Sequence, residues 1–365
     1  MDEKCKLNVL AMYLPQYHEI PENNEWWGKG FTEWTNVKKS KQLYKNHIQP
    51  QLPLGGYYYD LSDKTIMQKQ MRLAKKYGID GFCIYHYWFK GKKLLEKPLE
   101  DLLTFEKLEL PFCICWANEA WSRRWDGTNG VKSLLMPQEY GKEFEWEQHF
   151  QYLMPFLRHR DYIKVNGYPV FVIYNSIQIS ERKEMLNVWK KLAKKEGFPG
   201  IYVVNIRRMH IKDEVPFIGD EIADFEPHAT LNCLTEYEKE LISGIYRGNR
   251  KDNKNKEYSV FNYEKYCEYM VNRCISRGEK HNLGFFVGWD NTPRMGIETK
   301  LIFENNIPEV VERYFRIQYK RSLELNNRFL FINAWNEWGE GACIEPSMRY
   351  GKKYLEAIKK VRDEV

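Results

Sequence analysis

The residues best suited to chemistry are two glutamates near the end of the chain, Glu337 and Glu340, which stand three positions apart among glycines. Glycine permits tight backbone turns, so both carboxylates can be aimed at one point. Trp335 and Trp338 flank the pair and offer an apolar surface that can raise one carboxyl pKa. Paired carboxylates cleave or form a glycosidic bond when one is held protonated to assist the leaving oxygen and the other stays charged. We expect Glu337 and Glu340 to be catalytic; the alternative is a surface turn with solvated glutamates.

A second carboxylate group follows another apolar run, in the segment Cys115–Asp126. Glu119 in this segment is suited to be a catalytic acid, a substrate ligand or an ion-pair partner of Arg123 or Arg124. Structural pairing is about as common as function for such a residue. We therefore assign Glu119 to substrate binding, together with Asn118 and Trp121.

Aromatic residues are abundant, with 12 Trp, 25 Tyr and 19 Phe, and several stand beside polar residues. Flat apolar faces next to hydrogen-bonding groups suit sugar rings. On this pattern, and on position at strand ends, further substrate-binding candidates are Tyr17, His18, His86, Trp88, Glu226, His228, Asp290, Trp335 and Trp338. His18, His86 and His228 have no metal-binding spacing, so we expect no metal and no other cofactor.

The elements that must position these residues alternate between short apolar β-rich runs and helical patterns. Such alternation implies parallel strands joined by crossover helices, and eight units make a (β/α)₈ barrel. The predicted strands are Leu7–Leu14, Gly81–Tyr87, Pro111–Trp116, Val170–Tyr174, Ile201–Ile206, Ile222–Glu226, Leu283–Gly288 and Arg328–Ala334. The predicted helices are Asp63–Tyr77, Glu143–Leu157, Glu181–Glu196, Tyr263–Ser276, Pro308–Leu325 and Lys352–Val361.

Three connections are longer than usual and follow strand ends, at about residues 16–60, 120–141 and 229–281. Barrels build their sites at this face, so the lengths favour a deep cleft walled by loops. We expect residues 1–365 to form one barrel domain with these three insertions. The polar segment Arg247–Tyr258 is typical of an exposed loop.

Composition and missing motifs exclude several other classes of protein. Lys and Arg total 56 against 50 Asp and Glu, a formal charge of +6, and the basic residues are scattered, so no nucleic-acid surface is expected. No apolar run is long enough to span a membrane. The start of the chain leaves no room for a signal peptide, and Cys83, Cys113 and Cys115 lie in apolar runs, which predicts a cytoplasmic protein with reduced thiols. Phosphate-loop, dinucleotide-binding, nucleophile-elbow and Asp-x-Asp motifs are absent.

Six motifs together resemble the WbsX family, whose members look like relatives of glycoside hydrolase family 99, the endo-α-mannosidases and mannanases. The motifs are Ala11–His18, Trp27–Trp34, Tyr85–Trp88, Trp116–Glu119, Gly288–Arg294 and Trp335–Gly341, and matches run from about Val9 to Glu345. The resemblance implies a (β/α)₈ barrel and adds Glu33, Trp34 and Trp289 to the binding candidates.

Family 99 enzymes carry a Glu-Trp-His-Glu-Gly run, to which Glu337–Gly341 is similar. The resemblance to family 99 implies that Glu340 is the general acid/base and that Glu337 deprotonates the 2-hydroxyl of the sugar. The 2-oxygen then attacks the anomeric carbon, and the reaction proceeds with overall retention. The match departs at Gly339, where family 99 has His, and this departure bears on mannose specificity. A competing assignment makes Glu119 the acid/base and Glu337 a nucleophile, with carboxyl groups about 5–5.5 Å apart.

These observations favour a retaining, endo-acting glycoside hydrolase whose partner is an oligosaccharide or polysaccharide. The alternative is a glycosyltransferase of O-antigen or capsule synthesis, the role that the family label implies. A third possibility is a carbohydrate-binding protein without activity; the presence of both Glu337 and Glu340 argues against it.

Overall fold

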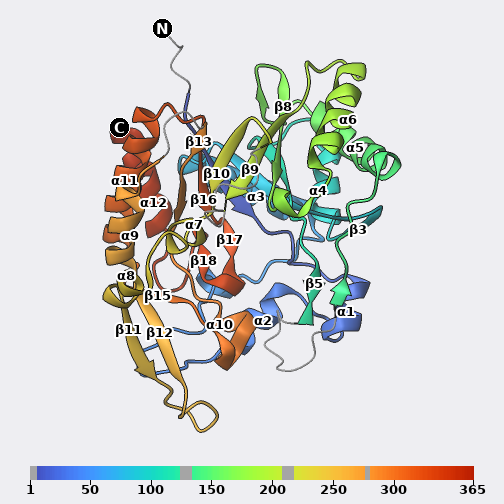
Figure 1. The fold of residues 1–365 in the computed structure, drawn as a ribbon. Helices are drawn as coiled ribbons and strands as arrows, with labels where there is room; N and C mark the ends of the chain where they lie inside the picture. Colours follow the sequence, from blue (N-terminus) through green and yellow to red (C-terminus); the bar gives the residue numbers. More distant parts are fainter. Residues whose placement is uncertain (1–5, 124–133, 208–217, 276–279) are drawn as a thin grey trace.

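A computed structural model describes residues 6–123, 134–207, 218–275 and 280–365. Its centre is a sheet of parallel strands, and the helices lie outside it (Figure 1). The strands are β1 (Asn8–Tyr13), β2 (Gly81–Phe89), β4 (Phe112–Trp116), β8 (Tyr168–Ile173), β9 (Tyr202–Arg207), β10 (Glu221–Asp224), β13 (His281–Asn282), β14 (Gly284–Phe286) and β16 (Phe329–Asn333). Each of the eight predicted strands is present, within two residues of its predicted ends.

The sheet curls round into a barrel. Its strand order is β13-β10-β9-β8-β4-β2-β1-β16-β14. The two outermost members, β13 and β14, are separated in the chain only by Leu283, so one chain segment pairs with β10 on one side and with β16 on the other. These ladders are parallel. The predicted (β/α)₈ barrel is therefore confirmed.

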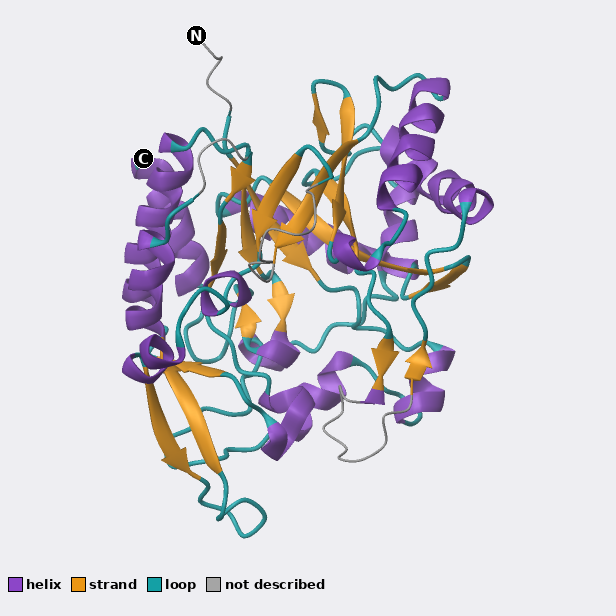
Figure 2. Ribbon diagram, viewed as in Figure 1, coloured by secondary structure: helices purple, strands orange, loops and turns teal. Residues whose placement is uncertain are grey.

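In the described part of the chain, six amphipathic helices cover the outside of the barrel, and all six were predicted from their periodicity (Figure 2). They are α3 (Lys64–Lys76), α5 (Glu143–Arg158), α6 (Arg182–Lys195), α9 (Tyr263–Asn272), α11 (Pro308–Glu324) and α12 (Lys353–Glu364). The connection from β9 to β10 falls mostly on residues 208–217, outside the described residues. No helix of the described part of the chain combines the length and apolar character that crossing a membrane requires.

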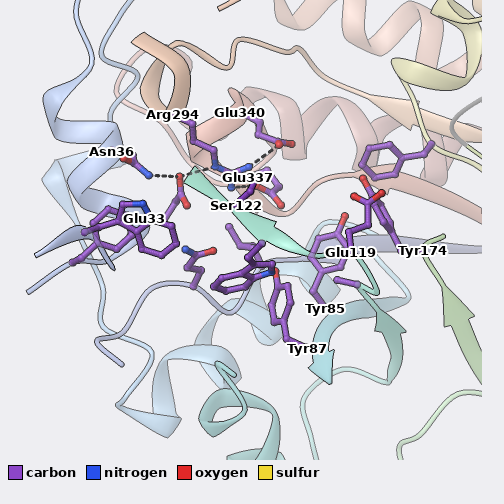
Figure 3. A pocket seen from close by; sticks show the side chains of 17 residues that line it. Glu33, Asn36, Tyr85, Tyr87, Glu119, Ser122, Tyr174, Arg294, Glu337 and Glu340 are labelled. Carbon is purple, nitrogen blue, oxygen red and sulfur yellow. Dashed lines mark hydrogen bonds and ion pairs between the residues drawn. The ribbon is translucent and has the colours of Figure 1, made fainter. Parts of the chain in front are cut away.

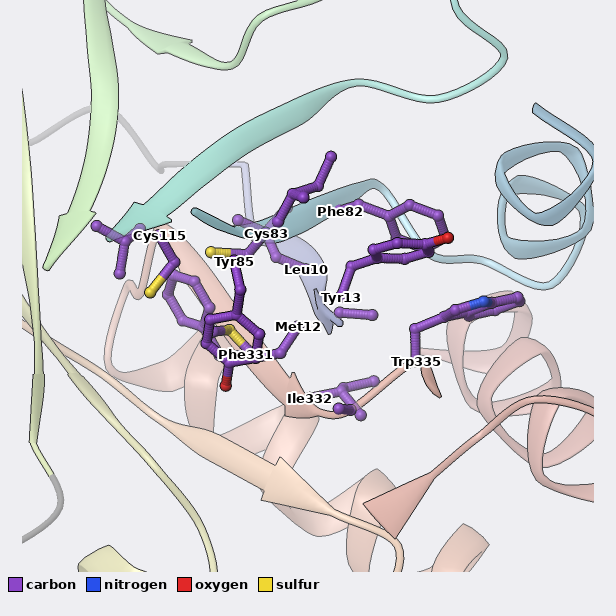
Figure 4. Close-up of a cluster of buried hydrophobic side chains, with 14 of the residues drawn as sticks. Leu10, Met12, Tyr13, Phe82, Cys83, Tyr85, Cys115, Phe331, Ile332 and Trp335 are labelled. Atoms are coloured by element: carbon purple, nitrogen blue, oxygen red, sulfur yellow. The ribbon is translucent and has the colours of Figure 1, made fainter. Parts of the chain in front are cut away.

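Buried side chains from neighbouring strands pack together in the core (Figure 4). Cys83 and Cys115 lie there among apolar residues such as Met12 and Phe331. Cys83, Cys113 and Cys115 are fully buried and free, as their apolar setting predicted. Thiols in such a setting act as small hydrophobes.

The long connections form elements of their own at the carboxyl ends of the strands. The first contains α1 (Pro21–Trp27) and α2 (Glu33–Lys39), and the second contains the strand pair β5 (Trp121–Ser122) and β6 (Leu134–Met136). The third contains α7 (His228–Leu231), α8 (Glu236–Leu241) and the antiparallel pair β11 (Ser243–Arg247) and β12 (Glu257–Asn262).

The prediction that Arg247–Tyr258 is entirely an exposed loop was wrong at its ends. Arg247 pairs with Glu257 across the two strands, and Tyr246 pairs with Tyr258. Tyr258 is buried beside Tyr44, so aromatic packing converts the ends of this polar segment into strands.

Candidate active site

One pocket opens where the barrel strands end, and it encloses about 880 Å³ of space free of protein atoms, its open mouth included. Figure 3 shows the side chains that surround it. They come from β2 itself, from segments that follow β1, β4, β8, β10, β14 and β16, and from the first two insertions. The lining residues are Leu14, Gln16, Trp27, Phe31, Glu33, Asn36, Tyr85, Tyr87, Ala117, Glu119, Trp121, Ser122, Tyr174, Phe225, Arg294, Glu337 and Glu340.

A tight turn after β16 brings Glu337 and Glu340 to this pocket. Strand β17 (Asn336–Glu337) pairs with β18 (Ala342–Cys343), and one 3₁₀ turn, η6 (Trp338–Glu340), joins them. Gly341 closes the turn with a φ of 63°, a left-handed conformation that favours glycine. The Asn336 side chain accepts from Leu14 N at 2.7 Å and donates to Leu14 O at 2.9 Å, which ties the turn to the end of β1.

Arg294 holds three carboxylates at one wall of the pocket. It lies on the short helix α10 (Thr292–Met295), which follows β14. Its Nε contacts Glu33 Oε1 at 2.9 Å, one terminal nitrogen contacts Glu337 Oε2 at 2.8 Å, and the other contacts Glu340 Oε1 at 2.6 Å. The two terminal nitrogens of one guanidinium thus hold the carboxylates of Glu337 and Glu340 close together. The fork of donors in arginine suits such planar contacts.

The Glu33–Arg294 pair rests directly on the backbone of Gly339. A Cβ atom at position 339 would stand 1.9 Å from Glu33 Oε1 and 2.8 Å from Arg294 Nε. Ordinary contacts of a Cβ atom are 3.4–4 Å. Glycine is therefore required here because the ion pair occupies the space that a side chain would fill.

Burial controls the electrostatics of this wall. Desolvation raises the pKa of Glu337, and the negative charge of Glu33 acts in the same direction, whereas Arg294 opposes both. The carboxyl group of Glu337 thus binds a proton more readily than an exposed glutamate. Burial also raises the pKa of the Tyr85 and Tyr87 hydroxyls, so both are uncharged at neutral pH.

The other walls of the pocket are mainly aromatic. Trp121 packs against Trp27 and Tyr87, with ring centroids 6.3 Å and 5.2 Å away. Tyr174 packs edge-on against Tyr85 at 6.0 Å and against Phe225 at 5.3 Å. Rings of this kind offer flat faces to an amphipathic ligand such as a sugar.

Glu119 lies in the aromatic part of the pocket. Its Oε1 accepts a hydrogen bond from Asn175 Nδ2 at 2.8 Å. Asn118 in turn bonds the backbone of Asn175 on both sides, donating to its carbonyl and accepting from its amide, each at 2.8 Å. Asn118 is buried and does not line the pocket, so it acts on Glu119 through Asn175. Arg124, one suggested partner of Glu119, lies outside the described residues.

Five of the candidate residues from the sequence come together at the pocket: Glu33, Glu119, Trp121, Glu337 and Glu340. The other candidates lie outside its lining, mostly in the core behind it. Trp335 is fully buried against Phe82 at 5.2 Å, so the expected sugar contact has no exposed ring face there. We leave those residues out of the proposed site.

Tyr17, Trp34 and Trp338 form an aromatic cluster behind the turn. Tyr17 packs against Trp34 at 4.5 Å, and Trp34 packs against Trp338 at 5.9 Å. The Tyr17 hydroxyl donates to Asn336 O and accepts from Trp338 N. These three residues support the turn from the protein side.

His18, His86 and Trp88 are also buried. His18 Nδ1 contacts Pro15 O at 3.1 Å. His86 Nε2 lies 2.9 Å from His149 Nε2, and Trp88 stacks on His149 with its ring centroid 4.7 Å away. Burial lowers the pKa of His18, His86 and His149, so these rings are neutral at neutral pH. Among the described residues, no group of three or more His, Cys, Asp or Glu is arranged to hold a metal ion.

Glu226, His228, Trp289 and Asp290 form internal contacts beside the pocket. Glu226 accepts from Thr230 N and Oγ1 and from Tyr266, while His228 packs edge-on against Trp289 at 4.8 Å. Asp290 also belongs to this internal framework. Its side chain accepts from His47, Gln49 and Thr292, and its amide donates to Glu340 O at 2.6 Å. Asp290 therefore shapes both the start of α10 and the end of the turn.

The lining residue that reasoning from sequence missed most clearly is Arg294. Arg294 ends the motif Gly288–Arg294, but no sequence pattern indicated that its side chain would contact the carboxylates. Tyr85 and Tyr87 were missed as well, although their spacing of two along a strand places both on one face. Gln16, Asn36 and Ser122 gave no signal beyond membership of a long loop.

The barrel and this pocket define a class of protein: a (β/α)₈ barrel with a carboxylate-rich, aromatic-walled pocket at the carboxyl ends of its strands. The model of the family described as "Glycosyltransferase WbsX" matches residues 9–358. The chain belongs to this family.

The chain is also similar to curated proteins in sequence and to solved structures in fold. The chain is 31% identical, over 98% of its length, to the WxcX proteins of two strains of Xanthomonas campestris pv. campestris, each described as uncharacterized. It spans about half the length of these curated relatives. Its fold is similar to that of the GH99 endo-alpha-mannosidase from Bacteroides thetaiotaomicron, with a TM-score of 0.57, 15% identity and 98% of each chain covered. It is also similar to a "Glycoside hydrolase-like protein", with a TM-score of 0.59, 13% identity and coverage of 97% and 93%.

Proposed function

We propose that this protein is a retaining, endo-acting glycoside hydrolase in which Glu340 is the general acid/base and Glu337 deprotonates the 2-hydroxyl of the substrate. The observation that carries the proposal is the binding of both carboxylates to one guanidinium at the wall of one pocket. This arrangement lets both groups act on one sugar unit. The similarity of the fold to a GH99 endo-alpha-mannosidase supports the same class of reaction.

The reaction proceeds in two balanced steps. Glu340 gives its proton to the leaving glycosidic oxygen while Glu337 takes the proton of the 2-hydroxyl, and the freed 2-oxygen attacks the anomeric carbon as the glycosidic bond breaks. Water then attacks that carbon, giving its proton to Glu340, and the 2-oxygen leaves and takes its proton back from Glu337. Two inversions at one carbon give overall retention.

The electrostatics of Glu337 suit its role as a base. Burial raises its pKa, which makes its carboxylate a stronger proton acceptor than an exposed glutamate. Arg294 also donates to Oε1 of Glu340, and the protonated acid keeps this contact through its carbonyl oxygen while its other oxygen carries the proton. The guanidinium also contacts Glu33 and Glu337. These contacts hold Glu337 in place while Glu340 changes its charge.

The aromatic walls and the long loops support an extended substrate. Trp27 and Trp121 come from the first and second insertions, so the pocket is bounded by elements outside the barrel itself. Sugar rings stack on such side chains while their hydroxyls bond to polar neighbours such as Gln16 and Asn36.

The direct test is to screen the protein against plant, fungal and bacterial polysaccharides, α-mannans included, and then to compare three glutamine variants on the cleaved substrate. We expect Glu340→Gln and Glu337→Gln each to lower kcat by at least roughly 10³-fold. Glu119→Gln separates the two assignments, because it alters a carboxylate of the same pocket outside the Arg294 group. Undiminished cleavage by Glu340→Gln would remove Glu340 from the mechanism, and a loss confined to Glu119→Gln and Glu337→Gln would favour the competing assignment. Proton NMR of the first product should show the retained anomer.

A second candidate function is glycosyl transfer, which the description of the family favours. The two functions differ in their donor. A transferase would consume an activated sugar, such as a nucleotide sugar, and lengthen an acceptor, whereas the proposed hydrolase requires none. Release of nucleotide from a panel of nucleotide sugars, dependent on Glu337 and Glu340, would favour transfer.

A further inference from the structure

A buried carboxylate lies directly behind the turn that carries Glu337 and Glu340. Glu345 follows β18 and is 8% exposed. Its Oε1 accepts from Gln70 Nε2 at 2.7 Å, and its Oε2 accepts from Tyr59 Oη at 2.9 Å and from Trp338 Nε1 at 2.8 Å. The described residues supply no ion-pair partner for it. Three neutral donors thus surround a group that does not line the pocket.

The donors join Glu345 to the turn. Trp338 lies between the two proposed catalytic residues, in η6. Tyr59 Oη also accepts from Asn336 Nδ2 at 3.2 Å, and Asn336 precedes Glu337. Through these two contacts, one carboxylate holds the residues on both sides of Glu337.

The same donors connect Glu345 to the barrel wall. Gln70 lies on α3, and its Oε1 accepts from the Tyr13 hydroxyl of β1 at 2.7 Å. This bond fixes the orientation of the amide, so that Nε2 faces Glu345. The turn is therefore anchored to α3 and β1 through a single carboxylate.

Only the ionised form of Glu345 satisfies all three donors. An indole N–H and an amide NH₂ cannot accept a hydrogen bond, so a protonated carboxyl can place its proton only toward Tyr59. Protonation therefore reverses or breaks the contact with Tyr59, which in turn accepts from Asn336, the residue before Glu337.

The surroundings place this change near neutral pH. Burial raises the pKa of Glu345 to about 7, against the lowering effect of its hydrogen bonds to Trp338, Tyr59 and Gln70 and of the nearby Trp335 indole N–H. The titratable groups that face Glu345 are Tyr13 of β1, Tyr17 and Tyr59 of the long connection after β1, and Cys343 of β18. Burial raises the pKa of each, so all four are neutral at pH 7.

We infer that Glu345 is a positioning residue, whose carboxylate holds the Glu337–Glu340 turn in its active geometry through Trp338 and Tyr59. The inference rests on the proposed function of Glu337 and Glu340. When Glu345 is protonated the turn loses an anchor, and catalysis falls without any change in the groups that touch the substrate.

The test compares Glu345→Gln and Trp338→Phe with the wild type on the substrate that the wild type cleaves. We expect each variant to lower kcat roughly 10- to 100-fold and to change KM less than about 3-fold, because a small misplacement of catalytic groups acts mainly on kcat. In Glu345→Gln, the part of the acidic decline of kcat with a midpoint near pH 7 should disappear. The matched control is Glu221→Gln, a buried carboxylate at the other end of the barrel that also accepts from an amide, Asn282 Nδ2; its kcat should be unchanged.

A readout independent of turnover is the NMR signal of the Trp338 indole N–H, assigned by its absence in Trp338→Phe. We expect this signal to shift with pH, with a midpoint near 7 in the wild type and no such shift in Glu345→Gln. A Trp338 signal that does not titrate, or a wild-type kcat in folded Glu345→Gln, would overturn the inference even if Glu337→Gln and Glu340→Gln are inactive. Activity in those two variants would instead overturn the proposed function.

Discussion

Replacing Gly339 with alanine tests whether the Glu33–Arg294 pair shapes the site. The new Cβ atom would stand 1.9 Å from Glu33 Oε1, where ordinary contact begins at 3.4 Å, so one of the two must move by about 1.5 Å. The Glu33–Arg294 contact is 2.9 Å, and such a movement takes it beyond hydrogen-bonding distance.

The cost follows from the burial of the pair. Glu33 is 1% exposed and Arg294 is 5% exposed. Breaking a buried ion pair costs about 3–5 kcal/mol. Replacing glycine with alanine returns about 0.4–1 kcal/mol by restricting the unfolded chain. We expect Gly339→Ala to lower the free energy of unfolding by about 2–4 kcal/mol and to lower kcat, because Arg294 also holds Glu337 and Glu340.

The assay is urea unfolding, followed by tryptophan fluorescence, with cleavage measured in parallel. Glu33→Ala supplies the control background, since it removes the closest clashing atom. In that background, Gly339→Ala should cost much less than in the wild type, so the two substitutions are strongly non-additive. A change of less than about 0.5 kcal/mol in the wild-type background, or simple additivity, would refute the reasoning.

Other substitutions test separate parts of the account. Arg294→Lys keeps the charge but cannot reach three carboxylates in one plane, so kcat should fall at least roughly 100-fold, and near wild-type kinetics would contradict the proposed role of the clamp. Trp121→Ala should raise the Kd of an oligosaccharide roughly 2- to 12-fold through lost ring stacking, which calorimetry on the Glu340→Gln protein can measure. Trp335→Ala should leave that Kd unchanged but lower the free energy of unfolding by about 3–5 kcal/mol, since the ring is in the core; the opposite pattern would place it at the substrate. Burial raises the pKa of Glu345 from 4.5 to about 7, so the folded chain binds the extra proton between these values and its stability falls as pH rises through them. Urea unfolding should therefore show the stability of the wild type relative to Glu345→Gln falling by about 3 kcal/mol from pH 4.5 to above pH 7, and a constant difference would contradict this assignment.

The barrel could be predicted because its signals are local. Each strand, such as Phe112–Trp116, is a short apolar run, and each covering helix shows a clear periodicity. The position of Glu337 and Glu340 at the carboxyl end of the last strand then follows from the rule that barrels build their sites at that face.

Whether an individual aromatic or polar residue lines the pocket or packs in the core could not be predicted in the same way. Trp121 and Trp335 stand in similar sequence surroundings, yet one lines the pocket and the other packs on Phe82. The difference depends on which side of the sheet or turn each ring faces, and irregular segments after a strand do not preserve its alternation. Glu226 likewise follows a strand but turns into the protein to bond Tyr266.

Arg294 and Gly339 illustrate a second limit. The departure from a histidine at position 339 was visible in the sequence, but its cause was not. The cause is a contact between residues 33, 294 and 339, which are far apart in the chain and meet only when α2, α10 and η6 pack together. Sequence patterns of one chain do not record such contacts.

The most direct test of the central claim is a crystal structure of the Glu340→Gln protein with an uncleaved oligosaccharide of the type that the wild type cleaves. The account predicts that residue 340 lies within hydrogen-bonding distance of the glycosidic oxygen and that Glu337 accepts from the 2-hydroxyl of the same sugar. A sugar bound with its scissile bond away from both residues, or outside the pocket around Arg294, would contradict the account.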